Sequence, residues 1–199
     1  MTAPRMMLFG DSHSYAIQRA IKRREAKGRL VPLAVYRLLK IKNDRELGDT
    51  SFEDFLVRAG KLSPNDVVLS AIGGNQHAVY STIQHPLAFN FFEPGSSAPI
   101  PAEVSIIPYR ILEANFAKGI RARDGASLTA LRNATKARVV HVLAPPPKRD
   151  NEHILRHHES RFAKENIAGL GVSSPELRMK FWNLQRRVLE DICDEVGIE

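Results

Sequence analysis

Short apolar runs rich in β-branched residues alternate along this chain with amphipathic segments. The apolar runs predict four strands, at residues 6–9, 29–36, 66–72 and 138–143. The amphipathic segments predict helices directly after residue 12 and at 50–59, 106–122, 125–136 and 175–196. Strands separated by helices form a mainly parallel sheet with right-handed crossovers, so the sequence predicts an α/β fold.

Two local signals refine these boundaries. Pro32 lies inside the run 29–36 and indicates an edge strand or a strand start, because proline cannot donate to a strand ladder. Thr50 or Ser51 is expected to cap the helix at 50–59, since a hydroxyl there can accept a backbone N–H of the first turn.

Glycine and polar residues follow the ends of the first and third predicted strands. Ser12 comes shortly after the first strand, and Gly-Gly-Asn at 73–75 follows the third. Ligands of open parallel sheets bind beyond the carboxyl ends of the strands, so we expect both segments at one functional rim. An irregular stretch at 77–102 follows. Its aromatic residues either line a substrate pocket or anchor the stretch to the core: Tyr80, Phe89, Phe91 and Phe92.

Three short blocks resemble those of the SGNH, or GDSL-type, hydrolase family. Gly-Asp-Ser at 10–12 looks like the nucleophile block, Leu-Gly-Asp-Thr-Ser at 47–51 like the second block, and 73–75 like the third. They occur in the family's order, and the resemblance covers residues 6–147. It implies a three-layer α/β/α flavodoxin-like fold. It also implies that Ser12 is the catalytic nucleophile, while the backbone N–H of Gly48 and the side chain of Asn75 are oxyanion donors.

The chemistry of these residues suits acyl transfer. A strand–turn–helix holds the hydroxyl of Ser12 clear of its own backbone, and Asp11 is expected to order that turn. Gly48 allows close backbone approach because it lacks Cβ. The resemblance therefore predicts a serine esterase or acyl hydrolase that acts on a small-molecule or carbohydrate ester, with no cofactor and no metal.

Each block also has a plain structural interpretation. Ser12 is a common kind of helix cap, Asn75 suits a turn after two glycines, and Gly48 suits an ordinary cap. If the chain is not a hydrolase, all three structural interpretations must be true at once and the family order of the blocks must be a coincidence. We therefore favour the hydrolase.

The general base is the part of the family pattern that is hardest to find. The resemblance implies an Asp-x-x-His block after the last strand, and none follows 175–196. Asp150 and His153 match the letters but come one crossover too early, and the alternative is a polar helix start capped by Asp150 or Asn151. His77, just after the third block, is the second candidate.

We therefore expect that the chain lacks its own base. It is predicted to be one SGNH-like domain over residues 1–199, C-terminally incomplete, with the last strand missing. The alternative function is a non-catalytic SGNH-like binding module.

Composition argues against several other classes of protein. The formal net charge is +7, but the densest basic stretch, 19–29, contains Glu25 and has no nucleic-acid-binding motif beside it. We interpret it as a solvated helix face. No apolar run reaches the roughly 18 residues of a membrane span, and a single cysteine fits a reducing compartment. The sequence thus predicts a cytoplasmic protein that binds neither nucleic acid nor membrane, and it indicates no oligomeric state.

The remaining metal-ligand residue types are expected to be structural. His153 and His157 share a helix face but lack an evident third ligand, so no metal site is predicted. His141 lies inside the strand 138–143 and Cys193 on the last helix, and both are expected to be packed.

Overall fold

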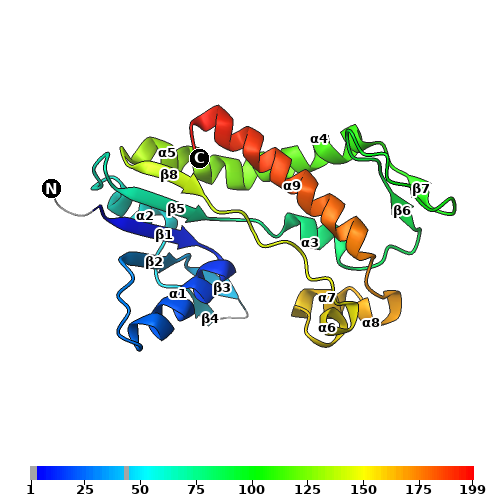
Figure 1. Cartoon of the computed structure of the whole chain (residues 1–199), viewed down its shortest axis with the longest axis horizontal. Helices are drawn as coiled ribbons and strands as arrows, with labels where there is room; N and C mark the ends of the chain where they lie inside the picture. Colours follow the sequence, from blue (N-terminus) through cyan, green and yellow to red (C-terminus); the bar gives the residue numbers. More distant parts are fainter. Residues whose placement is uncertain (1–3, 43–44) are drawn as a thin grey trace. The chain divides into compact units, whose positions relative to one another are not determined.

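The computed structural model describes residues 4–42 and 45–199 and has an α/β fold with a mainly parallel central sheet and helices on both sides of it (Figure 1). The described residues form two compact units. The first takes them from 4–74, 121–144 and 190–199, and the second from 75–120 and 145–189.

The first unit is built on a four-stranded parallel sheet. Its strands lie in the order β2 (Leu33–Arg37), β1 (Met6–Gly10), β5 (Val67–Ala71) and β8 (Arg138–His141). Gly10 is paired with Arg37 on one side and with Ala71 on the other, so the carboxyl ends of β1, β2 and β5 meet at one edge. The predicted parallel sheet is confirmed. β2 begins directly after Pro32 and is an edge strand of this sheet, as predicted.

Helices cover both faces of this sheet. In Figure 1, α1 (Ser12–Glu25) lies on one face, and α2 (Phe52–Ala59) and α5 (Ala126–Ala134) lie on the other. Phe9 of β1 is fully buried and stacks on Phe55 of α2, with 4.4 Å between the ring centroids. Ser51 caps α2, and its hydroxyl accepts the N–H of Asp54 at 3.0 Å, which confirms the predicted helix start.

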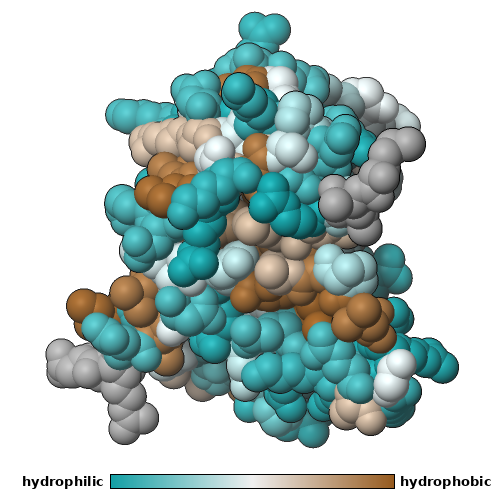
Figure 2. Space-filling view, turned by 90° about the vertical axis from the view of Figure 1, so that its left-hand side faces the viewer, coloured by the Kyte–Doolittle hydropathy of each residue, from teal (hydrophilic) through white to brown (hydrophobic). Residues whose placement is uncertain are grey.

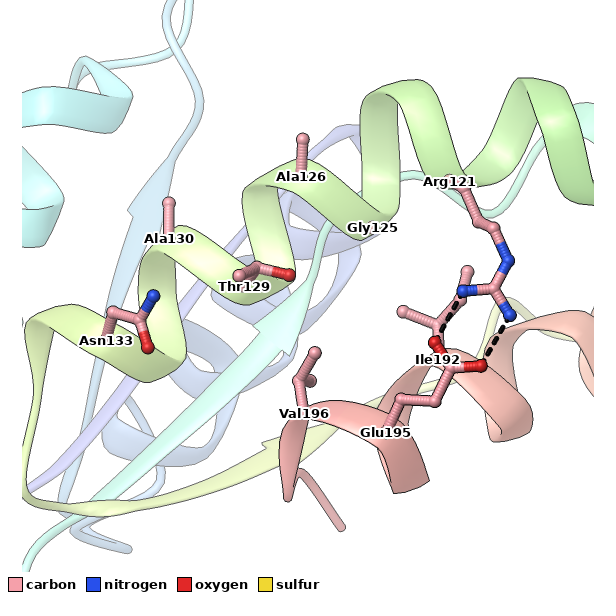
Figure 3. A pocket seen from close by; sticks show the side chains of 9 residues that line it. All are labelled: Arg121, Gly125, Ala126, Thr129, Ala130, Asn133, Ile192, Glu195 and Val196. Atoms are coloured by element: carbon pink, nitrogen blue, oxygen red, sulfur yellow. Dashed lines mark hydrogen bonds and ion pairs between the residues drawn. The ribbon is translucent and has the colours of Figure 1, made fainter.

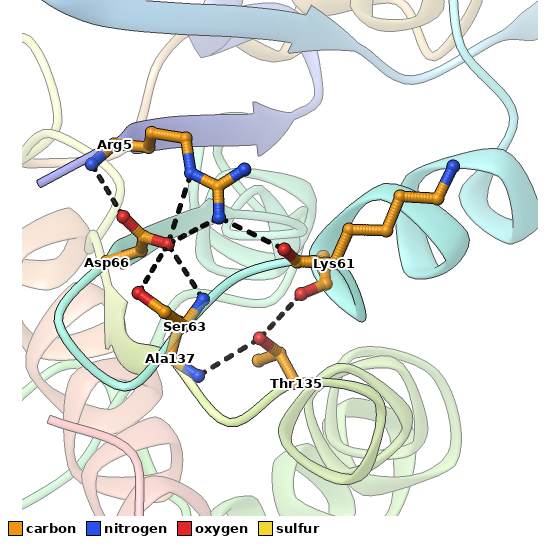
Figure 4. A network of polar contacts seen from close by, with 7 residues as sticks. Arg5, Lys61, Ser63, Asp66, Thr135 and Ala137 are labelled. Atoms are coloured by element: carbon orange, nitrogen blue, oxygen red, sulfur yellow. Dashed lines mark hydrogen bonds and ion pairs between the residues drawn. The ribbon is translucent and has the colours of Figure 1, made fainter. Parts of the chain in front are cut away.

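A polar network fastens the amino ends of β1 and β5 (Figure 4). The carboxylate of buried Asp66 accepts the backbone N–H of Arg5 at 2.7 Å and a guanidinium N–H of the same residue at 2.8 Å. Ser63 donates its N–H to this carboxylate at 2.7 Å and its hydroxyl at 2.9 Å. These bonds hold the pKa of Asp66 well below its usual range, because they stabilise the charged carboxylate.

The last residues of the chain lie beside β8. Helix α9 (Pro175–Val196) ends before Gly197, and Ile198 is buried. The N–H of Glu199 donates to the carbonyl of Val139 at 3.1 Å, and its carbonyl accepts the N–H of His141 at 2.6 Å. In parallel strands, a residue donates to one and accepts from the other of the two residues that flank its partner. Glu199 bonds to Val139 and His141 in this way, so it pairs with the free edge of β8.

Short elements between the strands differ from the predictions. Residues 38–48 include two antiparallel strands, β3 (Lys40–Lys42) and β4 (Arg45–Leu47), which are too short to show an alternating pattern. Helix α3 (Gln76–Ser81) occupies the start of the stretch predicted to be irregular from residue 77. Three more short helices, α6 (Asn151–Arg156), α7 (Ser160–Lys164) and α8 (Ile167–Leu170), precede α9. Such short helices depend on tertiary contacts and leave no clear period in the sequence.

The helical region at 109–134 has three parts. It begins with α4 (Tyr109–Ile120), continues as a π-helical turn, η1 (Arg121–Gly125), and ends as α5. β7 (Ser105–Ile106) precedes it and pairs in parallel with β6 (Phe89–Asn90).

Aromatic rings form the core of the second unit. Phe181 of α9 is buried, and its ring packs against four others, with the centroid distances Phe91 5.2 Å, Phe116 5.5 Å, Phe89 6.1 Å and Tyr80 6.4 Å. Tyr80, Phe89 and Phe91 therefore anchor this part of the chain to the core, one of the two roles considered for them. Phe92 is half exposed.

The exposed surface is mostly hydrophilic where the structure shows it. Every Lys and Arg of the basic stretch 19–29 is exposed, as expected for a solvated helix face. In the space-filling view, hydrophilic residues cover most of the visible face, and hydrophobic ones gather in a few patches, the largest of which extends from the centre toward the right (Figure 2). None of the described helices is both long enough and apolar enough to cross a membrane.

Candidate functional site

Ser12 is the first residue of α1, directly after the turn that ends β1. Its side chain is exposed, whereas Ser14 is buried and its hydroxyl donates to the carbonyl of Gly10 at 3.0 Å. Asp11 stands at the N-cap position, but its carboxylate makes no bond to the first turn of the helix. Within the described residues, the N–H of Ser12 therefore keeps no partner, as is usual at a helix start without a capping side chain.

The carboxylate of Asp11 ties three segments together. Its Oδ2 accepts the N–H of Gly73 at 2.8 Å, and its Oδ1 forms an ion pair with Lys40 of β3. The N–H of Asp11 donates to the carbonyl of Ala71 at 3.2 Å. The turn that carries Ser12 is thus fixed to the end of β5 and to β3, which is the ordering role expected of Asp11.

Gly48 lies just after β4, where the chain crosses the end of β2. Its φ is +103°, and a Cβ there would lie 2.2 Å from the carbonyl oxygen of Leu38, so the position requires glycine. The N–H of the next residue, Asp49, donates to the carbonyl of Arg37 at 3.0 Å. Because Arg37 is paired with Gly10, the first and second blocks follow the adjacent ends of β1 and β2. The N–H of Gly48 bonds to nothing in the part of the chain that the structure describes.

Two consecutive glycines with positive φ, +74° at Gly73 and +95° at Gly74, follow the end of β5. A Cβ on Gly73 would lie 2.2 Å from Oδ2 of Asp124, and a Cβ on Gly74 would lie 2.8 Å from Cβ of Ala144. Asp124 is buried in η1 and accepts the N–H of Gly74. Burial raises the pKa of Asp124, and the nearby charge of Asp11 raises it further.

Asp124 is the residue of this region that sequence reasoning missed. It stands in Arg-Ala-Arg-Asp-Gly at 121–125, which in sequence resembles a solvated break between two helices. The only sequence signal for this site was the interruption between the two predicted helices. In the structure a π-helical turn lies at this interruption, and such turns are frequent at functional sites.

Asn75 and His77 belong to the second unit, whereas Ser12 and Gly48 belong to the first. Asn75 is exposed, stands at the N-cap of α3, and does not use its side chain as a cap. His77 is buried, and its N–H donates to Oε1 of Gln185 at 2.7 Å, with its ring Nδ1 3.2 Å from the same oxygen. The convergence of Ser12, Gly48 and Asn75 stays a prediction.

The segment 150–153 has the structure of a capped helix start. The carboxylate of Asp150 accepts the backbone N–H of His153 at 2.9 Å, so Asp150 is the N-cap of α6, as its structural interpretation predicted. Nε2 of the His153 ring lies 3.0 Å from Nζ of Lys148. A lysine ammonium only donates hydrogen bonds, so in this contact the ring nitrogen is the acceptor. His153 as a general base stays a prediction, as does His77.

Other titratable groups have structural surroundings. His141 of β8 lies with Nδ1 3.3 Å from the hydroxyl of Ser70, and burial lowers its pKa to about 4. Cys193 is buried, and burial raises the pKa of its thiol to about 11, as expected of a packed cysteine. No group of three or more His, Cys, Asp or Glu residues suited to a metal ion occurs among residues 4–42 and 45–199.

Comparisons of the chain with protein-family models, with curated proteins and with solved structures found no match. A functional interpretation therefore depends on the residues and geometry of the chain itself.

Proposed function

We propose that the protein is a serine esterase of the SGNH type, with a three-layer flavodoxin-like fold. The observation that carries the proposal is the exposed hydroxyl of Ser12 at the first position of a helix, directly beyond the carboxyl end of β1. The unpartnered N–H of Ser12 among the described residues adds support, as does the obligatory glycine at position 48.

In the proposed reaction, the hydroxyl oxygen of Ser12 attacks the carbonyl carbon of an ester and its proton passes to a base. The oxyanion of the tetrahedral intermediate accepts hydrogen bonds from the N–H groups of Ser12 and Gly48 and from the Asn75 amide. One such donor contributes about 2.7–4 kcal/mol to the transition state in other serine hydrolases. The alcohol then leaves, and water hydrolyses the acyl-enzyme. An O-acetyl or other acyl ester of a small molecule or carbohydrate is the proposed substrate.

The second candidate is a non-catalytic binding module of the same fold. The contacts of 150–153 favour it, because Asp150 caps a helix and the ring of His153 accepts from Lys148. In this candidate the rim formed by the three blocks binds an ester or a related ligand without cleaving it.

A serine-directed fluorophosphonate probe distinguishes the two. The esterase should be labelled at Ser12, located by mass spectrometry of the digested protein, and should hydrolyse p-nitrophenyl acetate. Ser12→Ala should lose both, and Ser160→Ala, which removes an exposed hydroxyl at the start of α7, should lose neither. Absence of labelling in the unchanged protein would support the binding module.

A further inference from the structure

The second unit contains a cavity of about 180 Å³ with an unusual distribution of charge. Its polar wall includes Arg178, Lys148, His157 and His158, and its apolar part includes Ile154 and Phe162. Glu159, which is exposed, supplies the one carboxylate among the residues that line it. Cationic and imidazole groups therefore outnumber acidic groups around this space.

Arg178 of α9 is the most constrained of these groups, with 1% of its surface exposed. Its guanidinium donates to the backbone carbonyls of Ser173 and Lys148, the latter at 2.9 Å, and to the side-chain oxygen of Asn151 at 2.8 Å. All these acceptors are neutral. In the part of the chain that the structure describes, Nε of Arg178 is buried without a hydrogen-bond partner, and no carboxylate forms an ion pair with this residue.

The carboxylate beside Arg178 in sequence is already engaged. Glu176 accepts its own backbone N–H and the hydroxyl of Ser174 at the start of α9. Burial lowers the pKa of Arg178, and the negative charge of Glu176 offsets only part of this effect, so the charged form of Arg178 is disfavoured overall. A buried cation without a directly bound carboxylate is costly, and a bound anion reduces that cost.

Arg121 of the first unit shows the contrast. It lines a separate groove of about 530 Å³ between α5 and the end of α9. Its guanidinium and the carboxylate of Glu195 point toward one another and form two bonds of 2.6 and 2.7 Å (Figure 3). That charge is neutralised within the protein, so the groove offers no comparable attraction for an anion.

We propose that the cavity at Arg178 binds a small organic anion, with a carboxylate or phosphate head held by Arg178 and Lys148 and an apolar part on Ile154 and Phe162. The guanidinium supplies fixed donors, and the ammonium of Lys148, an exposed residue of the lining, supplies a second positive charge. This site is independent of the proposed esterase chemistry at Ser12.

Isothermal titration of the full chain tests the site with two probes, sodium butyrate and sodium phosphate, at an ionic strength held constant with sodium chloride. We expect saturable binding of at least one probe. Binding of butyrate alone identifies a carboxylate site, and binding of phosphate alone identifies a phosphate site. Lys148→Met should weaken the binding about fivefold or more, since it removes one charged contact but keeps the backbone carbonyl that Arg178 uses.

Lys164→Met is the matched control, because it removes the same charge from an exposed position on α7 in the same unit. Its affinity should equal that of the unchanged protein. If Arg178→Met folds, it should bind neither probe. If Arg178→Met does not fold, the affinity of Lys148→Met tests the proposal. The proposal is overturned if neither probe binds, in which case Arg178 only ties backbone carbonyls together. It is also overturned if Lys164→Met weakens binding as much as Lys148→Met, because the effect would then be one of net charge.

Discussion

Among single residues, the glycine after β5 is constrained both by its backbone conformation and by a neighbouring side chain. Gly73 has a φ of +74°, and a Cβ would lie 2.2 Å from the carboxylate of Asp124. Gly73→Ala should therefore lower the free energy of unfolding through both backbone strain and a clash. Gly28→Ala is a control for the strain alone, because its φ is +71° and nothing lies within 4 Å of the added Cβ.

We expect Gly28→Ala to cost about 1–2 kcal/mol for the left-handed backbone, and Gly73→Ala to cost about 1–3 kcal/mol more for the overpacking. Urea unfolding of both variants measures the difference. Equal losses would mean that the Asp124 side chain moves aside freely and does not define the turn.

Asp124 itself gives a second prediction. Its pKa is raised in the folded protein, chiefly by burial, so the folded state binds this proton more tightly than the unfolded chain does. This group's contribution to stability therefore falls as pH rises through the folded pKa. Asp124→Asn removes the charge but keeps an oxygen that can accept the N–H of Gly74. Its urea midpoint at pH 7 should exceed that of the unchanged protein, and this advantage should shrink at pH 4.5. A lower midpoint at pH 7 would show that the charge is stabilising.

Among the strands, β8 contains a histidine, His141, whose titration makes the stability of the protein depend on pH. Burial lowers the pKa of His141 from 6.5 to about 4. The unfolded chain therefore takes up this proton near pH 6.5, while the folded protein does not. The stabilisation from neutral His141 is complete above pH 6.5 and is lost as the pH falls toward 4, by about 3 kcal/mol at most.

His141→Gln removes this titration from β8, and urea unfolding at pH 7 and pH 4.5 measures its effect. The unchanged protein should lose more stability between the two pH values than the variant does. His85→Gln, at an exposed histidine, should lose as much as the unchanged protein. If His141→Gln lost as much as the unchanged protein, another group would account for the acid sensitivity.

Strands and helices with a sustained hydrophobic period could be predicted from the sequence. α9 has the bounds predicted for it, β5 and β8 lie inside the predicted segments, and β1 extends one residue beyond its segment. β3 and β4 could not be predicted, because three residues carry too little pattern and their pairing depends on tertiary contacts.

Some residues of the candidate site could likewise be predicted from the sequence, and others could not. Ser12 and Gly48 were found because motifs and strand ends mark them in the sequence. Asp124 was missed because its burial beside Gly73 depends on a π-helical turn and on the packing around it. A base for Ser12 is a question of distances between segments far apart in the chain, which spacing alone does not give.

In the whole molecule, the two units are interleaved along the chain. The first takes three separate segments and the second takes two, and α9 contributes residues to both. Neither unit is one continuous chain segment, so neither can fold completely before segments of the other have been synthesised. We therefore expect the chain to unfold in one cooperative transition.

Two matched core substitutions test this. Phe181→Ala opens the aromatic core of the second unit, and Phe55→Ala opens the core of the first, where Phe55 stacks on Phe9. Each should cost about 3–5 kcal/mol. The single tryptophan, Trp182, reports on the second unit by fluorescence, while far-UV circular dichroism reports on the helices of both. In either variant, fluorescence and circular dichroism should give the same lowered urea midpoint. The reason is that the two units share α9 and are interleaved along the chain, so unfolding of one should unfold the other. A fluorescence transition that shifts alone in Phe181→Ala, with the dichroism splitting into two steps, would instead show two units that unfold independently.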